Sequence, residues 1–277
     1  MNILVTNDDG IDSPGLWALA EAMSRVGEIL IVAPEGQQSG VGTSVSLHSD
    51  MSVAEVSPSI KGVRAYAIGG TPSDCVIIGL RRLAQGHIDL IVSGINLGPN
   101  VGNDIPYSGT VMATLQGYFR KIPSIAMSLA TGERAEEPRF DVASKVAESL
   151  AQSVNSGKMP TDAILNINVP NIPLEQIKGI VTTRTASTGY VKLAEVEGSG
   201  SLSYSRGIRK TASTYLPHQV LVGDSHVIEE GTDLWAINAG YISITPLRLD
   251  ITDHDTIPAL AEPILELESD LLGNSTR

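Results

Sequence analysis

The sequence has little cysteine, few aromatic residues and no long apolar run, and each shortage excludes a class of protein. Cys75 is the single cysteine among 277 residues, so no disulfide can form within the chain, which is typical of a reducing compartment. Aromatic residues make up 4% of the chain, too few for an extended base-stacking surface. No apolar run approaches the roughly 20 residues of a membrane-spanning helix.

Basic residues are also scarce, since 19 Lys and Arg face 31 Asp and Glu and give a formal net charge of -12. An acidic chain of this kind disfavours binding to a nucleic acid polymer but leaves room for one nucleotide, particularly beside a metal ion. The chain as given starts without a basic segment followed by an apolar one. We therefore expect a cytoplasmic protein with no membrane association.

Apolar runs alternate with segments of helical spacing along the first two thirds of the chain. The runs at residues 3–5, 29–33, 88–93, 122–129 and 163–169 are continuous, as in strands covered on both faces of a parallel sheet. The segments with helical spacing are 14–26, 72–83, 108–121 and 140–155. This alternation predicts an α/β fold, a mostly parallel sheet with helices on both faces.

The last third of the chain changes character. Residues 181–230 are rich in Gly, Ser and Thr and alternate with a short period, which predicts a β-hairpin arm. Residues 231–277 then predict a returning strand and a C-terminal helix that Pro263 kinks. With no repeat or low-complexity linker, we expect one domain over 1–277, in which 1–180 form the α/β core and the remainder a β-hairpin-rich C-terminal extension.

The stretch Asn7-Asp8-Asp9-Gly10 follows the first apolar run directly. Two adjacent carboxylates next to a buried strand need a partner, because ionised groups near the interior are costly without pairing or a cation. A divalent metal is one such partner. An ordinary Asp-Gly turn whose acids face water is the other interpretation, and this stretch alone leaves both open.

Two other predicted strands also end in oxygen-bearing side chains. Ser39 and Gly40 follow the second strand, and Asn96 follows the third. In open α/β sheets ligands bind at the carboxyl ends of the strands, and carboxylate, hydroxyl and amide oxygens suit Mg²⁺, Mn²⁺ or Ca²⁺. Taken singly, Ser39 could be a plain loop hydroxyl and Asn96 could hold its own turn.

Ser108, Gly109 and Thr110 open a predicted helix. Free backbone N–H groups at a helix start, together with two hydroxyls, suit a phosphate group. Plain helix capping by Ser108 and Thr110 is the alternative. A metal site beside an anion site suggests phosphoryl chemistry, in which the metal polarises the phosphate or activates a water.

Five motifs follow one another along the chain. They read ILVTNDDGIDSPG, VAPEGQQSGVGTS, GGTPSDCV, VSGINLGPNVGNDIPYSGTVMA and GYISITPL. They resemble the survival protein E (SurE) family, densely over residues 1–130 and more sparsely through LNINVP and TPLRLDITDH. The resemblance implies a Rossmann-like core and one divalent cation per subunit, Mg²⁺ or Mn²⁺. It places the metal ligands on Asp8, Asp9, Ser39 and Asn96. It also implies a homodimer or homotetramer formed through the hairpin arm.

The resemblance implies a 5′-nucleotidase, a metal-dependent phosphatase that releases phosphate from nucleoside 5′-monophosphates. For the mechanism, our hypothesis is hydrolysis by a metal-activated water. Asp8 and Asp9 are then the catalytic residues, with Asp9 favoured to orient or deprotonate the water. The phosphate-binding residues predicted beside them are Asn96, Ser108, Gly109 and Thr110. A non-catalytic, metal-dependent nucleotide sensor stays open as an alternative, as does a phosphatase with an aspartyl nucleophile.

Overall fold

The computed structural model describes residues 1–131, 137–160, 162, 164–189, 191–195, 202–205, 208–211, 215–219 and 228–272. The chain divides into two compact units, Met1–Leu247 and Arg248–Arg277, which are described separately. The predicted boundaries of core, arm and returning segment stay a prediction. Within the described ranges no helix combines the length and hydropathy needed to cross a membrane.

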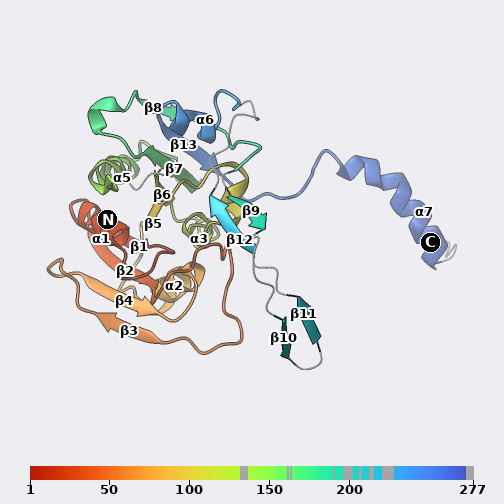
Figure 1. Ribbon diagram of the computed structural model, residues 1–277, viewed down its shortest axis with the longest axis horizontal. Coiled ribbons are helices and arrows are strands. Elements are labelled where there is room, and N and C mark those ends of the chain that lie inside the picture. Colours follow the sequence, from red (N-terminus) through yellow and green to blue (C-terminus); the bar gives the residue numbers. More distant parts are fainter. Residues whose placement is uncertain are drawn as a thin grey trace. The chain divides into compact units, whose positions relative to one another are not determined.

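The first unit is built on a nine-stranded sheet (Figure 1). Its strands, in spatial order, are β3 (Val53–Val56), β4 (Arg64–Ile68), β2 (Glu28–Pro34), β1 (Asn2–Thr6), β5 (Leu90–Leu97), β6 (Ser124–Ala130), β7 (Ile164–Pro170), β13 (Ile242–Leu247) and β8 (Ile180–Thr182). The six strands from β4 to β7 are mutually parallel. The strands β3 and β13 run antiparallel to β4 and β7, and β8 is parallel to β13.

Alternate side chains of β1 pack into two separate apolar cores, one on each face of the sheet. This explains why the apolar residues of β1 are consecutive. Ile3 and Val5 pack with α1 (Pro14–Ser24) and α5 (Phe140–Asn155), whereas Leu4 packs with α2 (Pro72–Ile78) on the other face. All three side chains are fully buried. Figure 1 shows α1 and α5 on one side of the sheet and α2 on the other, with α3 (Gly109–Ala113). The predicted α/β fold with helices on both faces is confirmed.

Several predicted elements form where the sequence places them. The helix predicted over 140–155 is α5, and Thr71 caps α2 in a reciprocal capping box with Asp74. The single helix expected over 108–121 is instead two short helices, α3 and α4 (Leu115–Tyr118). The remaining helices of this unit are η1 (Gly79–Leu83), η2 (Gly102–Tyr107), η3 (Leu174–Gln176) and α6 (Asp233–Asn238).

The stretch predicted as hairpins contains two antiparallel strand pairs. The first pair is β9 (Val191–Glu195) with β12 (Tyr215–Gln219), and the second is β10 (Leu202–Ser205) with β11 (Ile208–Thr211). The connecting residues lie outside the described part of the chain. The second unit contains η4 (Ile257–Leu260) and α7 (Ala261–Leu272). The helix type changes before Pro263, which occupies the first turn of α7, where its missing N–H is not needed.

The order of the strands defines where a ligand can bind. From β1 the chain builds outward through β2 and β4, and it then crosses back to add β5, β6 and β7 on the other side of β1. The sheet therefore has its topological switch point between β1 and β5. In open α/β sheets the crevice beyond the carboxyl ends of such a strand pair is the usual ligand site.

Candidate active site

Asp8 and Asp9 leave the carboxyl end of β1 at this switch point. Asn7 closes the turn below them: its Nδ2 donates to the carbonyl of Gly10 at 2.9 Å, and its Oδ1 accepts from the Gly10 N–H at 3.2 Å. Asn7 is fully buried, and the Asp8 side chain is 4% exposed. A simple surface turn with acids in water is therefore wrong for Asp8, because its carboxylate lies in the interior.

Asp8 is held by the start of α3. The Thr110 hydroxyl donates a short hydrogen bond to Asp8 Oδ1, and the backbone N–H groups of Gly109 and Thr110 point at the same carboxylate. Burial raises the pKa of Asp8, and these donors oppose the rise. A Cβ at Gly109 would lie 2.7 Å from Asp8 Cβ and 2.9 Å from Asp8 Oδ2. Only glycine lets the helix approach the acid this closely.

Asp9 is more accessible than its neighbour. The backbone N–H of Leu97, the last residue of β5, donates to its carboxylate. Burial, and secondly the negative charge of Asp8, raise the pKa of Asp9 to about 6. The two adjacent acids are thus partly desolvated and repel each other when both are ionised, which is costly unless a cation lies between them.

Ser39 lies in the loop after β2 and is exposed. Its Oγ accepts from Gln37 Nε2 at 3.1 Å. The neighbouring Gln38 N–H donates to the backbone carbonyl of Asp8 at 2.7 Å, which ties this loop to the end of β1. Ser39 is therefore one residue from a direct contact with Asp8.

Asn96 lies inside β5, whereas the sequence predicts it beyond the strand end. The β5–β6 register shifts between Ser93 and Asn96, and such irregularities re-aim side chains near functional sites. Asn96 Nδ2 donates to the Gly98 carbonyl at 2.8 Å, so the amide nitrogen is engaged and Oδ1 is the atom suited to a hard cation. Its neighbour Leu97 contacts Asp9.

The structure thus brings the four predicted metal ligands to one edge of the sheet. Among the described residues no Lys, Arg or His forms an ion pair with Asp8 or Asp9. Nor does this part of the chain contain a cluster of three or more His, Cys, Asp or Glu suited to a metal. A cation here would take its remaining protein ligands from Ser39 and Asn96, a hard-oxygen set that suits Mg²⁺ or Mn²⁺. The residues fit the group, and their role as ligands stays a prediction.

The predicted phosphate-binding residues have visible partners of their own. Ser108 caps α3, because its Oγ accepts from the Val111 N–H at 3.1 Å, and this bond leaves the hydroxyl hydrogen to donate elsewhere. The anion at the start of α3 in this structure is the carboxylate of Asp8. Gly109 and Thr110 therefore contact an acid directly, and their binding of phosphate stays a prediction.

Buried asparagines from β7 fix the loop that precedes α3, and the sequence reading missed them. Asn168 Oδ1 accepts from the Asn100 N–H at 2.8 Å, and the Nδ2 atoms of Asn166 and Asn168 donate to the Asn100 carbonyl. Asp233 extends this support by accepting from the Gly102 N–H at 2.9 Å. Two asparagines spaced two apart in an otherwise apolar strand were the available signal, since they share one face.

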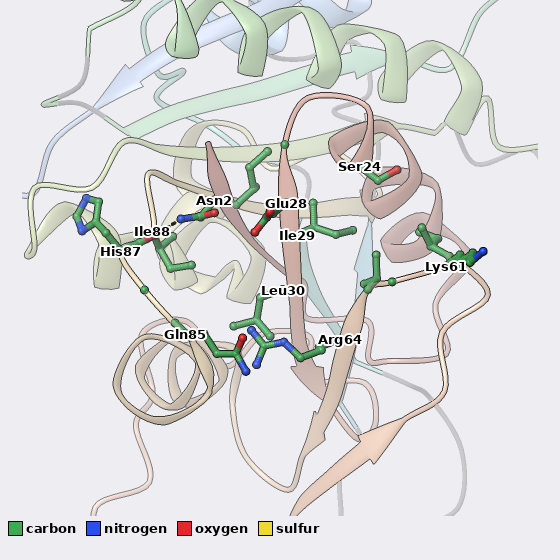
Figure 2. Close-up of a pocket in the computed structure, with 17 residues that line it drawn as sticks. Asn2, Ser24, Glu28, Ile29, Leu30, Lys61, Arg64, Gln85, His87 and Ile88 are labelled. Carbon is green, nitrogen blue, oxygen red and sulfur yellow. Dashed lines mark hydrogen bonds between the residues drawn. The ribbon is translucent and has the colours of Figure 1, made fainter.

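A cavity of about 800 Å³ lies at the opposite, amino edge of the sheet (Figure 2). Glu28 carries the one carboxylate among the residues that line it, and this side chain is exposed. In Figure 2 the Arg64 side chain points towards Gln85, and Arg64 Nη1 donates to the Leu83 carbonyl at 2.9 Å. This cavity lacks paired acids, so we propose the carboxyl edge, which carries Asp8 and Asp9, as the active site.

Comparisons with known proteins agree with the fold. Residues 3–192 match the family described as "Survival protein SurE". A relative from Dehalococcoides mccartyi (strain CBDB1), named 5′-nucleotidase SurE, is 42% identical over 249 residues, or 90% of this chain and 89% of the relative. A relative of the same name from Geobacter metallireducens is 37% identical over 262 residues, or 94% and 96% of the two chains.

The crystal structure of the SurE protein from Aquifex aeolicus is similar throughout, with a TM-score of 0.77 and 35% sequence identity over 95% of this chain and 100% of that one. The family suggested by the five sequence motifs is thereby confirmed. The family match covers more than half of this chain, and the relatives align with nine tenths of it or more. The chain therefore belongs to the survival protein SurE family.

Proposed function

We propose that this protein is a metal-dependent 5′-nucleotidase that hydrolyses nucleoside 5′-monophosphates to nucleoside and phosphate. Family membership supports the broader class: the chain is a phosphoric monoester hydrolase, and its curated relatives are named 5′-nucleotidase SurE. The metal dependence, the substrate and the mechanism are the proposed steps.

One observation supports the metal most directly. Asp8 and Asp9 are adjacent, one is buried and the other partly so, and no basic side chain of the described residues pairs with either. When bound, a divalent cation would supply the missing positive charge, polarise a phosphate oxygen and acidify a water. We assign Asp8, Asp9, Ser39 and Asn96 to hold it.

The two acids have different surroundings and, we propose, different tasks. Asp8 is fixed by Thr110 and by the backbone of α3, so it can position charge but has little freedom to move. Asp9 is the more accessible acid and receives a backbone hydrogen bond from Leu97. It can therefore face a water and accept its proton as the phosphate ester is attacked.

For the phosphate we propose the residues named from the sequence, Asn96, Ser108, Gly109 and Thr110. Ser108 is the best placed of these, since its hydroxyl hydrogen is not used by the cap bond to Val111. A homodimer or homotetramer through the hairpin arm is also a proposal, which light scattering of the purified protein would test.

Phosphate release from AMP and GMP tests the function. Purified protein should release phosphate with added Mn²⁺ or Mg²⁺, and chelation should abolish the release until metal is restored. Absence of release across several metals would refute the enzymatic proposal and favour a nucleotide sensor. A phosphoaspartate trapped by rapid quenching would instead support the aspartyl nucleophile.

A variant of Thr110 distinguishes two roles for this residue, namely binding of the phosphate and support of Asp8. In Thr110→Val the hydroxyl is lost at nearly constant side-chain volume. We expect the metal concentration for half-maximal activity to rise by roughly 10–100-fold, which is the usual effect of losing a hydrogen bond to a metal-binding side chain. Thr110→Ser should restore it. A rise in KM for AMP at saturating metal, with metal affinity unchanged, would place Thr110 on the phosphate instead.

A further inference from the structure

We propose that the ring of Tyr107 is the surface on which the nucleobase of the substrate stacks. This inference rests on the proposed nucleotidase function and adds a specificity-determining residue to it. Tyr107 ends η2, one residue before Ser108, and its side chain is 62% exposed. Aromatic residues make up only 4% of the chain, and this exposed one lies two residues from Gly109, which contacts Asp8.

Three large exposed apolar side chains lie in segments at or beyond the carboxyl ends of parallel strands. Leu47 lies in the loop after β2, Leu97 ends β5 next to Asn96, and Tyr107 follows in η2. Of these three, Tyr107 offers a flat aromatic face. Stacking on such a face tolerates different bases, because every base has a π surface and no particular hydrogen-bond pattern is needed.

The backbone that carries Tyr107 is fixed. Its carbonyl accepts from the Gly42 N–H at 3.0 Å, so η2 is bonded to the loop that carries Ser39. Gly42 has a φ of +54°, and a Cβ there would lie 2.7 Å from the Pro106 carbonyl oxygen. Ile105 anchors the same turn in the core, with 6% exposure. A ring on a rigid backbone loses little conformational entropy when a ligand stacks on it.

The position of Tyr107 also fits a nucleotide. Successive Cα atoms are about 3.8 Å apart, so the Cα of Tyr107 lies within roughly 8 Å of that of Gly109, which contacts Asp8. A phosphate held by the acids and their cation would leave the ribose and base to extend outward from the crevice. The backbone of Tyr107 is bonded to the loop that carries Ser39 and directly precedes Ser108, the cap of α3.

The molecule supplies a matched control. Phe119 is the other aromatic side chain among the large exposed apolar residues of the described chain, with 58% exposure. It lies between α4 and the start of β6, at the amino edge of the parallel strands, where its ring contacts Tyr118. Loss of either ring removes a similar exposed surface, but of the two only Tyr107 lies near Gly109 in the chain, and Gly109 contacts Asp8.

The test compares AMP with ribose 5-phosphate, which has the same reacting group and no base. In Tyr107→Ala the ratio of kcat/KM for AMP to that for ribose 5-phosphate should fall by about fivefold to a hundredfold, the range for loss of one base–aromatic stack. The fall should appear as a higher KM for AMP with kcat retained, because stacking far from the phosphorus is equal in ground and transition states. Tyr107→Phe should keep the wild-type ratio, as should Phe119→Ala.

Equal losses for both substrates in Tyr107→Ala, or no loss for either, would overturn the proposal, and so would the same fall in Phe119→Ala. These results differ from failure of the proposed function. In that case the wild-type protein would release phosphate from neither compound at any metal concentration, and the stacking role would fall with it.

Discussion

The two edges of the central sheet contrast more sharply than its two faces. At the amino edge, the polar side chains around the large cavity close loops: Arg64 donates to the Leu83 carbonyl and Asn2 to that of His87. At the carboxyl edge, Asp8 is buried and Asp9 partly buried, and no basic side chain of the described residues forms an ion pair with either. The comparison teaches that unpaired charge, rather than the size of a cavity, marks the reactive edge.

Neutralising one acid at each edge, in separate variants, should give the largest difference in the rate of phosphate release. Asp9→Asn keeps an oxygen that can accept from the Leu97 N–H but removes the charge, and we expect phosphate release to fall by about a thousandfold or more, since metal assistance contributes several kcal/mol to such reactions. Glu28→Gln at the amino edge should leave the rate unchanged. Equal rates for both variants would remove the basis of the comparison.

Glycines at the two edges give the next largest contrast. A methyl group at Gly109 would meet Asp8, whereas nothing lies within 4 Å of the corresponding position at Gly86. Gly109→Ala should therefore displace the acid and lower kcat about a hundredfold, as expected for a misplacement near 1 Å. Gly86→Ala should be neutral. If Gly109→Ala kept full activity, the close contact with Asp8 would have no role in catalysis.

The acid pair should also cost stability when no metal is bound. The pKa of Asp9 is raised to about 6, so the folded state holds a proton that the unfolded state has lost between pH 3.8 and 6. Stability should therefore fall as the pH rises through this range, and the cost should be complete above it. Because Asp9 is only partly buried, solvent screening reduces the full shift of about 3 kcal/mol to roughly 1–2 kcal/mol.

Urea unfolding in a chelator measures this cost. Metal-free Asp9→Asn should be more stable than the wild type at pH 8, by roughly 1–2 kcal/mol, and nearly equal to it at pH 4. Added Mn²⁺ should reverse the order at pH 8, since only the wild type keeps both acids to bind it. A wild type that is more stable than Asp9→Asn in chelator at pH 8 would show that the acids already have a cationic partner.

The elements that were predicted well from the sequence depend on local patterns. The helix α5 matches its prediction residue for residue because its apolar positions recur at helical spacing, and α2 begins where Thr71 and Asp74 form a capping box. The neighbourhood of Asp8, Asp9, Ser39 and Asn96 could also be inferred, because parallel strands bring their carboxyl ends to one edge. The first inference needs only local spacing and capping residues, and the second needs only the order of the strands.

Contacts between distant segments could not be inferred in this way. Thr110 lies 102 residues from Asp8, and a helix-start threonine gives no sign that its hydroxyl binds an acid. Asn96 was placed beyond its strand, because the irregular pairing of β5 with β6 that includes it depends on the neighbouring strand. The helix expected over 108–121 is split at Thr114, although the apolar pattern continues through both parts. These details depend on tertiary packing that a local pattern does not contain.

The smallest effect is predicted for a substitution at the amino edge, which tests whether the two edges of the sheet are independent. Asn2 Nδ2 donates to the His87 carbonyl at 2.8 Å in a solvent-exposed position. Asn2→Ala should therefore cost roughly 0.5–1 kcal/mol of unfolding free energy, the low end of the range for a lost hydrogen bond, and leave kcat and KM for AMP unchanged. Urea midpoints and initial rates on the same preparations measure both. Asn2 begins β1, and Asp8 and Asp9 follow the end of this strand at Thr6. A change in kcat without a change in stability would therefore mean that β1 transmits a disturbance along its length. The two edges would then be coupled, and the cavity at the amino edge would become a place from which the active site can be influenced.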